Sequence, residues 1–203
     1  MDNSLVTKAG GHHAFKTLYH QFVCKTLSER EHYFYQVIPP SLRLIVPKYG
    51  GSLENENGKF LVLENLTQGF MKPSVLDLKI GTRMYSDFAT ESKMISQRRK
   101  CSKTTSSTVG LRFCGCSKYN IEKNCYEKTD KYAGRTDDLF LLTSLIQSFF
   151  SISCGDTIDR VSHCIIKCVI EELEKMKEIL SALGKSTILL FPLKHICFSK
   201  CFP

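Results

Sequence analysis

The chain has 203 residues, which suits one domain of ordinary size or two small lobes. Its apolar fraction of 42% supplies a core and excludes wholesale disorder. The 28 basic and 20 acidic residues leave a net charge of +8. That charge favours an anionic partner such as nucleic acid, a phosphoinositide or a soluble polyphosphate, and the positions of the basic residues must discriminate among these.

No targeting or membrane segment is recognisable. Residues 1–11 lack the apolar stretch of a signal peptide, and no run reaches the roughly 18 apolar residues that span a bilayer. We therefore expect a soluble protein, cytoplasmic and/or nuclear, whose ten cysteines are reduced. The spacings of these cysteines do not form a paired CxxC set, so we expect no metal site, and Cys164 and Cys168 are expected on the apolar face of a helix.

The first elements form a strand–helix–strand pattern. Residues 21–24 predict a short strand, and Ser28 predicts the start of a helix over residues 29–37. Glu31 occupies the third helical position, as a capping box requires. Residues 59–64 follow an Asn-Gly turn signal and predict a buried strand.

The rest of the chain is richer in helix. The elements expected there are a basic helix over 87–100, a hairpin of strands 108–119 and 123–128, a helix that Asp137-Asp138 caps and that ends at Phe150, and a long helix from Gly155. The apolar stripe of the long helix is expected at Val161, Ile165, Cys168, Leu173, Met176, Leu180 and Leu183, with an outer ion pair of Glu171 and Lys175. This order of elements favours an α+β protein in two unequal lobes.

Lys25 and Glu31 are the first residues that suit phosphoryl transfer, which needs cations around the transferred group and a metal-holding carboxylate. A strand lysine and a helical glutamate can form an ion pair that directs the ammonium towards nucleotide phosphates. The alternative is an ordinary surface lysine beside a capping glutamate.

Asp77 and Lys79 are two residues apart on an extended segment, so their side chains face the same side. The carboxylate can accept from a ribose hydroxyl, and the ammonium can contact a phosphate oxygen. Gly81 would allow a close approach of the backbone to a ligand. The alternative is a salt bridge at the end of a strand.

The basic helix presents Lys93, Ser96, Gln97 and Lys100 on one face, which suits a compact polyanion with phosphates around a ring. A solvated charged face is the alternative. Arg112 lies among apolar neighbours and needs a partner, either a phosphate or an internal carboxylate.

Taken in order, these motifs resemble the inositol polyphosphate kinase family, and within it the inositol hexakisphosphate kinases. The segment Pro73-Ser-Val-Leu-Asp77-Leu-Lys79-Ile-Gly81 matches the PxxxDxKxG signature of that family. Further similar segments are Gly10-Gly11-His12 and residues 23–35, 60–66, 89–101, 104–115 and 132–135. The resemblance covers roughly residues 9 to 183.

The resemblance implies a two-lobed, protein-kinase-like α+β fold, also described as SAICAR-synthase-like, with ATP in the cleft. Residues 1–65 would form the ATP-binding lobe, residues 66–185 the substrate-binding lobe, and residues 186–203 a divergent tail. The implied reaction is ATP-dependent phosphorylation of an inositol polyphosphate, foremost of inositol hexakisphosphate to a diphosphoinositol, with Mg²⁺.

The resemblance also implies roles for single residues. Lys25 would hold the nucleotide phosphates and Glu31 would orient it, while the backbone at Glu64 and Leu66 would contact adenine. Asp77 and Lys79 would be the catalytic pair, with Asp77 on the ribose and Lys79 on the transferred phosphate and the acceptor. The inositol phosphate would be held by Lys79, Lys93, Ser96, Gln97, Lys100 and Arg112.

The C-terminal part departs from the family pattern. Residues 186–190 weakly resemble the family's Ser-Ser-Leu-Leu strand, but the following Ile-Asp-Phe-Ala-His motif, whose aspartate holds magnesium, is absent. No acidic residue follows Glu178, and residues 192–203 resemble no part of the family. The alternative is therefore a catalytically impaired inositol-phosphate-binding protein from a truncated or divergent chain.

We expect a monomer with no membrane partner and, because no nucleic-acid module is present, no nucleic-acid partner.

Overall fold

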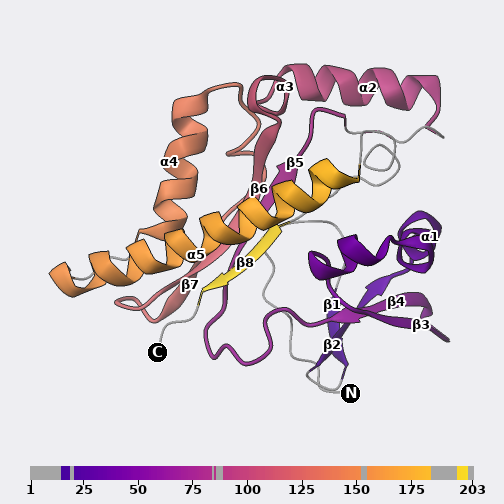
Figure 1. Cartoon of the computed structure of the whole chain (residues 1–203), viewed down its shortest axis with the longest axis horizontal. Helices are drawn as coiled ribbons and strands as arrows, with labels where there is room; N and C mark the ends of the chain where they lie inside the picture. The colour runs from indigo at the N-terminus through magenta and orange to yellow at the C-terminus, as the bar shows by residue number, and fades with distance from the viewer. Residues whose placement is uncertain are drawn as a thin grey trace. The chain divides into compact units, whose positions relative to one another are not determined.

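The computed structural model describes residues 15–18, 21–83, 85, 89–151, 155–183 and 196–200. These residues divide into two compact units, one up to Met71 and one from Lys72 (Figure 1). Within these ranges no helix is both long enough and apolar enough to cross a membrane. The expected features at residues 10–12, Asp87 and residues 186–190 lie outside the described residues.

The first unit is a four-stranded antiparallel sheet in the order β1-β2-β4-β3 with two short helices. Its elements are β1 (Phe15–Leu18), β2 (Phe22–Thr26), α1 (Glu29–Val37), η1 (Pro40–Leu44), β3 (Tyr49–Asn55) and β4 (Gly58–Glu64). The predicted strands correspond to β2 and β4. Strand β3 was not predicted, because it begins Tyr-Gly-Gly and lacks an apolar pattern. In the structure it has no buried residue and carries a register shift against β4.

Helix α1 spans the predicted residues, but the predicted capping box is wrong. The Ser28 side chain makes no capping hydrogen bond. The carboxylate of Glu31 instead accepts two hydrogen bonds from the Lys25 ammonium. A charge-assisted contact is roughly twice as strong as a neutral one, which accounts for this choice of partner.

The second unit is a four-stranded antiparallel sheet in the order β7-β6-β5-β8 with four helices. Its elements are β5 (Ser74–Ile80), α2 (Glu91–Ser102), α3 (Ser106–Val109), β6 (Leu111–Asn120), β7 (Cys125–Thr129), α4 (Leu139–Phe150), α5 (Gly155–Ala182) and β8 (Ile196–Lys200). Figure 1 shows α2 and α3 at one end of β5 and β6.

The core of the second unit lies between the sheet and helices α4 and α5. Leu76, Leu78 and Phe113 are buried with residues of α4, and Ile165 and Val169 of α5 pack against them. Helix α4 begins as predicted, because the Asp138 carboxylate accepts from the first helical amides.

Gly134 lies directly against strand β6. A Cβ atom at this position would stand 2.0 Å from the carbonyl oxygen of Phe113. No side chain fits there, so this glycine allows the loop after β7 to pack on the central strand.

The starts of helix α2 and of strand β6 differ most from the prediction. Helix α2 begins at Glu91, where Thr90 caps it by accepting from the Lys93 amide. Residues 106–109 form helix α3 rather than strand, and Gly110 ends that helix in the left-handed region, with φ of 66°. The first strand of the hairpin therefore begins at Leu111.

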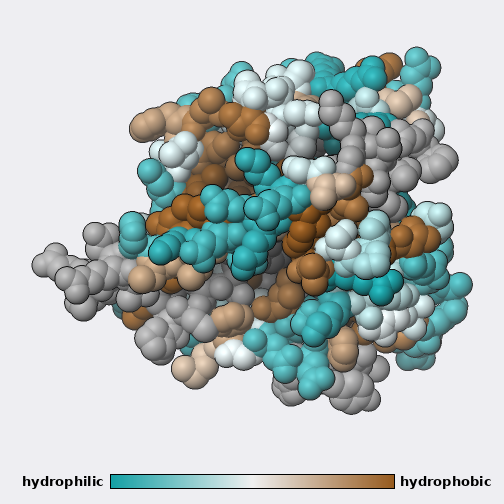
Figure 2. Space-filling model, viewed as in Figure 1, coloured by the Kyte–Doolittle hydropathy of each residue, from teal (hydrophilic) through white to brown (hydrophobic). Residues whose placement is uncertain are grey.

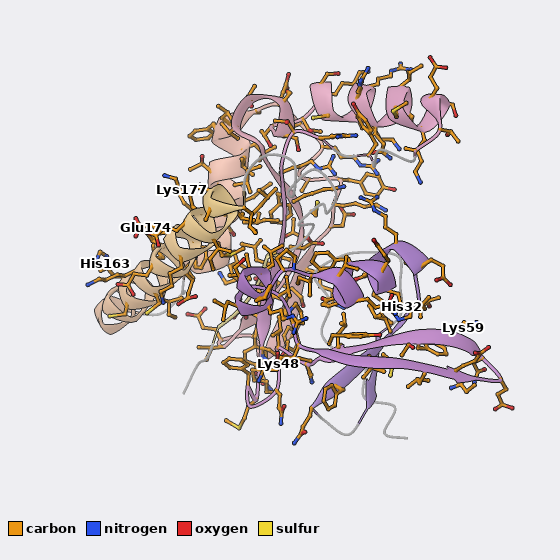
Figure 3. The ribbon with its side chains drawn as sticks, turned by 45° about the vertical axis from the view of Figure 1, so that its right-hand side comes forward. His32, Lys48, Lys59, His163, Glu174 and Lys177 are labelled. Atoms are coloured by element: carbon orange, nitrogen blue, oxygen red, sulfur yellow. The ribbon has the colours of Figure 1, made fainter. Side chains whose placement is uncertain are left out.

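The predicted apolar stripe of α5 is wrong at Cys168, whereas its other described positions are half-buried as expected; the Val161 side chain lies outside the described residues. Cys164 and Cys168 are exposed, whereas Ile165 and Val169 are half-buried. Lys175 pairs with Glu172 at 2.6 Å, not with Glu171, because a three-residue spacing also brings side chains together. Figure 2 shows a hydrophilic band over α5, and the labelled His163, Glu174 and Lys177 project outward from it in Figure 3.

Strand β8 comes from the segment that resembles no part of the family. It pairs antiparallel with β5, and the register sets Cys197 opposite Asp77 and Phe198 opposite Leu76. Strand β5, which carries the signature, therefore has neighbours on both edges.

Candidate functional site

In the first unit, the predicted ion pair of Lys25 and Glu31 is present. The Lys25 Nζ atom lies 2.7 and 3.0 Å from the two carboxylate oxygens of Glu31. Their side chains are only 18% and 30% exposed. Beneath the pair, Tyr35 is buried and stacks on Tyr49 with ring centres 5.4 Å apart. Burial, with the charge of Glu31, raises the pKa of Tyr35, so its phenol stays protonated.

Glu64 and Leu66 lie at the end of β4 and just beyond it. The Glu64 amide donates to the Lys48 carbonyl, and the Glu64 carboxylate accepts from the Lys48 amide. Leu66 is 42% exposed. Because the amide of Glu64 already has a partner, an adenine contact at this residue would use its carbonyl oxygen as acceptor.

In the second unit, pairing of β5 with β6 brings Asp77, Lys79 and Arg112 together. Lys79 stands directly opposite Arg112 in the register. A β-bulge follows Asp77, whose partner Gly115 has φ of 138°, and Cys114 is the extra residue of the bulge. We call Asp77, Lys79, Arg112 and Cys114 the β5–β6 cluster.

The charges of the β5–β6 cluster act on the Lys79 ammonium. Burial and, next, the Arg112 guanidinium lower the pKa of Lys79, and Lys100 of α2 adds to that effect. Cys114, in its thiolate form, and Asp77 act in the opposite direction. Among the described residues, two further cations, Arg112 and Lys100, and one carboxylate, the buried Asp77, thus act on Lys79. A half-buried surplus of positive charge is costly unless an anion joins it.

Cys114 is the member of the cluster that the sequence interpretation missed. Its alternation with Arg112 along one strand was the available signal. Burial and the neighbouring Asp77 raise its pKa, so it stays a neutral thiol, and it receives a hydrogen bond from Arg112. Cys114 therefore adds no charge to the cluster at neutral pH.

The predicted face of α2 is only partly connected with this cluster. Lys93, Ser96 and Lys100 are exposed and Gln97 is half-buried. Lys100 is close enough to Lys79 to influence its pKa. Among the described residues we find no comparable interaction for Lys93 or Ser96. Their assignment to the substrate stays a prediction.

Among the described residues, no group of three or more His, Cys, Asp or Glu side chains is gathered. Magnesium on a nucleotide needs only one or two carboxylates. However, the buried carboxylate at hand, Asp77, stands beside Lys79 and Arg112, whose charges oppose a further cation.

Comparison with known proteins agrees with this chemistry. The sequence model of inositol polyphosphate kinase matches residues 60–191. Over 82 residues the chain is 44% identical to human inositol hexakisphosphate kinase 3, which covers 40% of this chain and 20% of that protein. Over 77 residues it is 51% identical to inositol hexakisphosphate kinase 1 of Saccharomyces cerevisiae, covering 38% and 7%. The chain thus spans a fifth or less of these relatives.

The fold is similar to that of inositol phosphate multikinase Ipk2 from S. cerevisiae, solved in complex with ADP and Mn²⁺. The TM-score is 0.69 at 26% identity, covering 78% of this chain and 68% of that one. This likeness confirms the expected α+β fold. Since the family model also matches more than half of the residues, the chain belongs to the inositol polyphosphate kinase family.

Proposed function

We propose that this chain transfers a phosphoryl group from ATP to an inositol polyphosphate, foremost inositol hexakisphosphate. The observation that carries the proposal is the half-buried surplus of positive charge around Lys79. An acceptor dense in phosphates would supply the anions that this cluster needs. The identity to inositol hexakisphosphate kinases, over 77 to 82 residues, supports that acceptor.

The proposed roles follow from charge and position. Lys79 would contact the transferred phosphate and the acceptor, while Arg112 and Lys100 would hold further acceptor phosphates. Asp77 would accept from the ribose hydroxyls. In the first unit, Lys25, oriented by Glu31, would hold nucleotide phosphates, as an ammonium held by one carboxylate keeps a fixed direction.

Binding without transfer is the second candidate. It is supported by the surroundings of Asp77, a buried carboxylate on which Lys79 acts with a charge that opposes a metal cation. A nucleotide-bound metal carries much of the charge neutralisation in phosphoryl transfer, so a chain that holds metal poorly would bind its ligand and turn it over slowly.

Radiolabelled ATP transfer to inositol hexakisphosphate, measured beside calorimetric binding, separates the two candidates. Transfer supports the kinase, and binding without transfer supports the second candidate. Lys100→Ala should weaken binding at least fivefold, whereas Lys103→Ala, an exposed charge at the end of the same helix, should leave it unchanged. Equal affinity for all three proteins would remove Lys100 from the proposed binding residues, and the absence of both binding and transfer would contradict both candidates.

A further inference from the structure

The segment between β5 and α2 is tied to the last turns of α2. The Cys101 thiol donates to the Thr82 carbonyl at 2.9 Å. The Nε of Arg98 donates to the Tyr85 hydroxyl, also at 2.9 Å. The guanidinium carbons of Arg98 and Arg83 lie 5.3 and 4.8 Å from the centre of the Tyr85 ring, within range of a cation–π interaction.

These polar contacts matter because α2 has little apolar anchoring. Cys101 is its one buried residue. Met94 and Gln97 are half-buried, and the other residues of the helix are exposed. A helix held by so little hydrophobic burial depends on specific contacts for a fixed position.

The residues of α2 that contact the protein and the residue proposed to contact the ligand lie on different faces of the helix. At about 100° per residue, Arg98 and Cys101 lie on the side that faces the segment from β5, and Lys100 lies on the adjoining side. Arg99 lies on the opposite flank of the helix from Lys100, and both are about 130° from the middle of the contacting side. Arg98 and Arg99 are both exposed, and the difference between them is the hydrogen bond that Arg98 donates to Tyr85.

We propose that Arg98 and Tyr85 are positioning residues that fix α2 with respect to β5 and thereby hold Lys100 beside the β5–β6 cluster. The inference rests on the proposed function, in which Lys100 contacts the inositol phosphate. Arg98 would act through Lys100 rather than by touching the ligand. Its planar guanidinium both stacks on the ring and donates to the hydroxyl, which a lysine cannot reproduce.

The test compares Arg98→Lys, Tyr85→Phe, their double variant and the control Arg99→Lys. All four keep the net charge. We expect Arg98→Lys and Tyr85→Phe each to raise the calorimetric Kd for inositol hexakisphosphate three- to tenfold and to change the Kd for ATP less than twofold. The double variant should be no weaker than the more affected single one, because both remove the same contact. Arg99→Lys should bind like the original chain.

A second measurement does not depend on ligand. Amide hydrogen exchange in the last two turns of α2 should be faster in Arg98→Lys and Tyr85→Phe than in Arg99→Lys. Unchanged exchange in both variants would overturn the inference. So would a Tyr85→Phe variant that binds normally while Arg98→Lys does not, because Arg98 would then contact the ligand itself. If Lys100→Ala weakens binding but these variants do not, the positioning role fails and the proposed function survives.

Discussion

The two units hold their lysines in opposite electrostatic conditions. Lys25 is matched by the carboxylate of Glu31 within one partly buried ion pair. Lys79 lies opposite Arg112 in the pairing of β5 with β6 and is influenced by Lys100, and Asp77 is the carboxylate among the described residues that acts on it. The first arrangement is satisfied within the protein. Within the described residues the second keeps a surplus of positive charge that a bound anion would neutralise, and this difference is why we propose the β5–β6 cluster as the inositol phosphate site.

The largest effect is expected from Lys79→Met. Removal of an ammonium at the transferred group should lower phosphoryl transfer by about 100-fold or more. The same change should keep or raise stability, by up to about 1 kcal/mol, because it relieves repulsion with Arg112. Chemical denaturation beside the transfer assay measures both. Lys128→Met, an exposed charge on β7, is the control and should change neither. If Lys79→Met lowers stability and leaves transfer normal, then Lys79 has a structural role like that of Lys25 and no role at the transferred phosphate.

Glu31→Gln should lower stability, in contrast to Lys79→Met. It leaves the partly buried Lys25 ammonium without its matching charge, and we expect a loss of about 1–2 kcal/mol in the free energy of unfolding. Glu54→Gln removes the partner of Lys59 in a mostly exposed pair at the β3–β4 hairpin, where Lys59 is labelled in Figure 3, and should leave stability unchanged. Equal stability of both variants would show that Lys25 needs no internal partner.

The pH dependence of binding sharpens the same comparison. The pKa of Lys79 is lowered below its ordinary 10.5, so the folded chain holds this proton less tightly than the unfolded chain does. A bound anion would favour the protonated ammonium. Stability without ligand should therefore rise as pH increases from the folded pKa of Lys79 towards 10.5, while affinity for inositol hexakisphosphate falls. Arg112→Met should move that fall in affinity to higher pH. A profile that does not move would mean that Arg112 does not act on Lys79.

Cys114→Ser should have the smallest effect. The thiol receives a hydrogen bond from Arg112 but carries no charge at neutral pH, so a hydroxyl of similar size should conserve most of that contact. We expect the calorimetric Kd for inositol hexakisphosphate to change about twofold, a small fraction of the effect of charge removal. A tenfold rise in this Kd would show that the Cys114 thiol contributes to ligand binding in a way that the charges of the cluster do not explain.

Elements with strong local signals were predictable from sequence. Asp138 before an apolar run specifies the start of α4, and the Asn-Gly turn specifies β4. The errors arose where tertiary partners decided the outcome. The sequence offered Glu31 both a capping role and an ion pair with Lys25, and only the ion pair is present; on α5, Val169 and not the predicted Cys168 is half-buried.

The candidate site was predictable only in part for the same reason. The spacing of Asp77 and Lys79 placed them on one face, but the bulge at Cys114 and the opposition of Lys79 and Arg112 depend on strand pairing. The contact of Arg98 with Tyr85, residues 13 apart in sequence, likewise has no short-range pattern.

The pKa of Lys79, followed by NMR of its side chain with and without inositol hexakisphosphate, tests the central claim most directly. Lys79→Met assigns the signal. We predict a pKa below 10.5 in the ligand-free chain, lowered by burial and Arg112, and a clear rise when the ligand saturates the site. A bound ligand that leaves the pKa of Lys79 unchanged would contradict the assignment of the phosphates to the β5–β6 cluster.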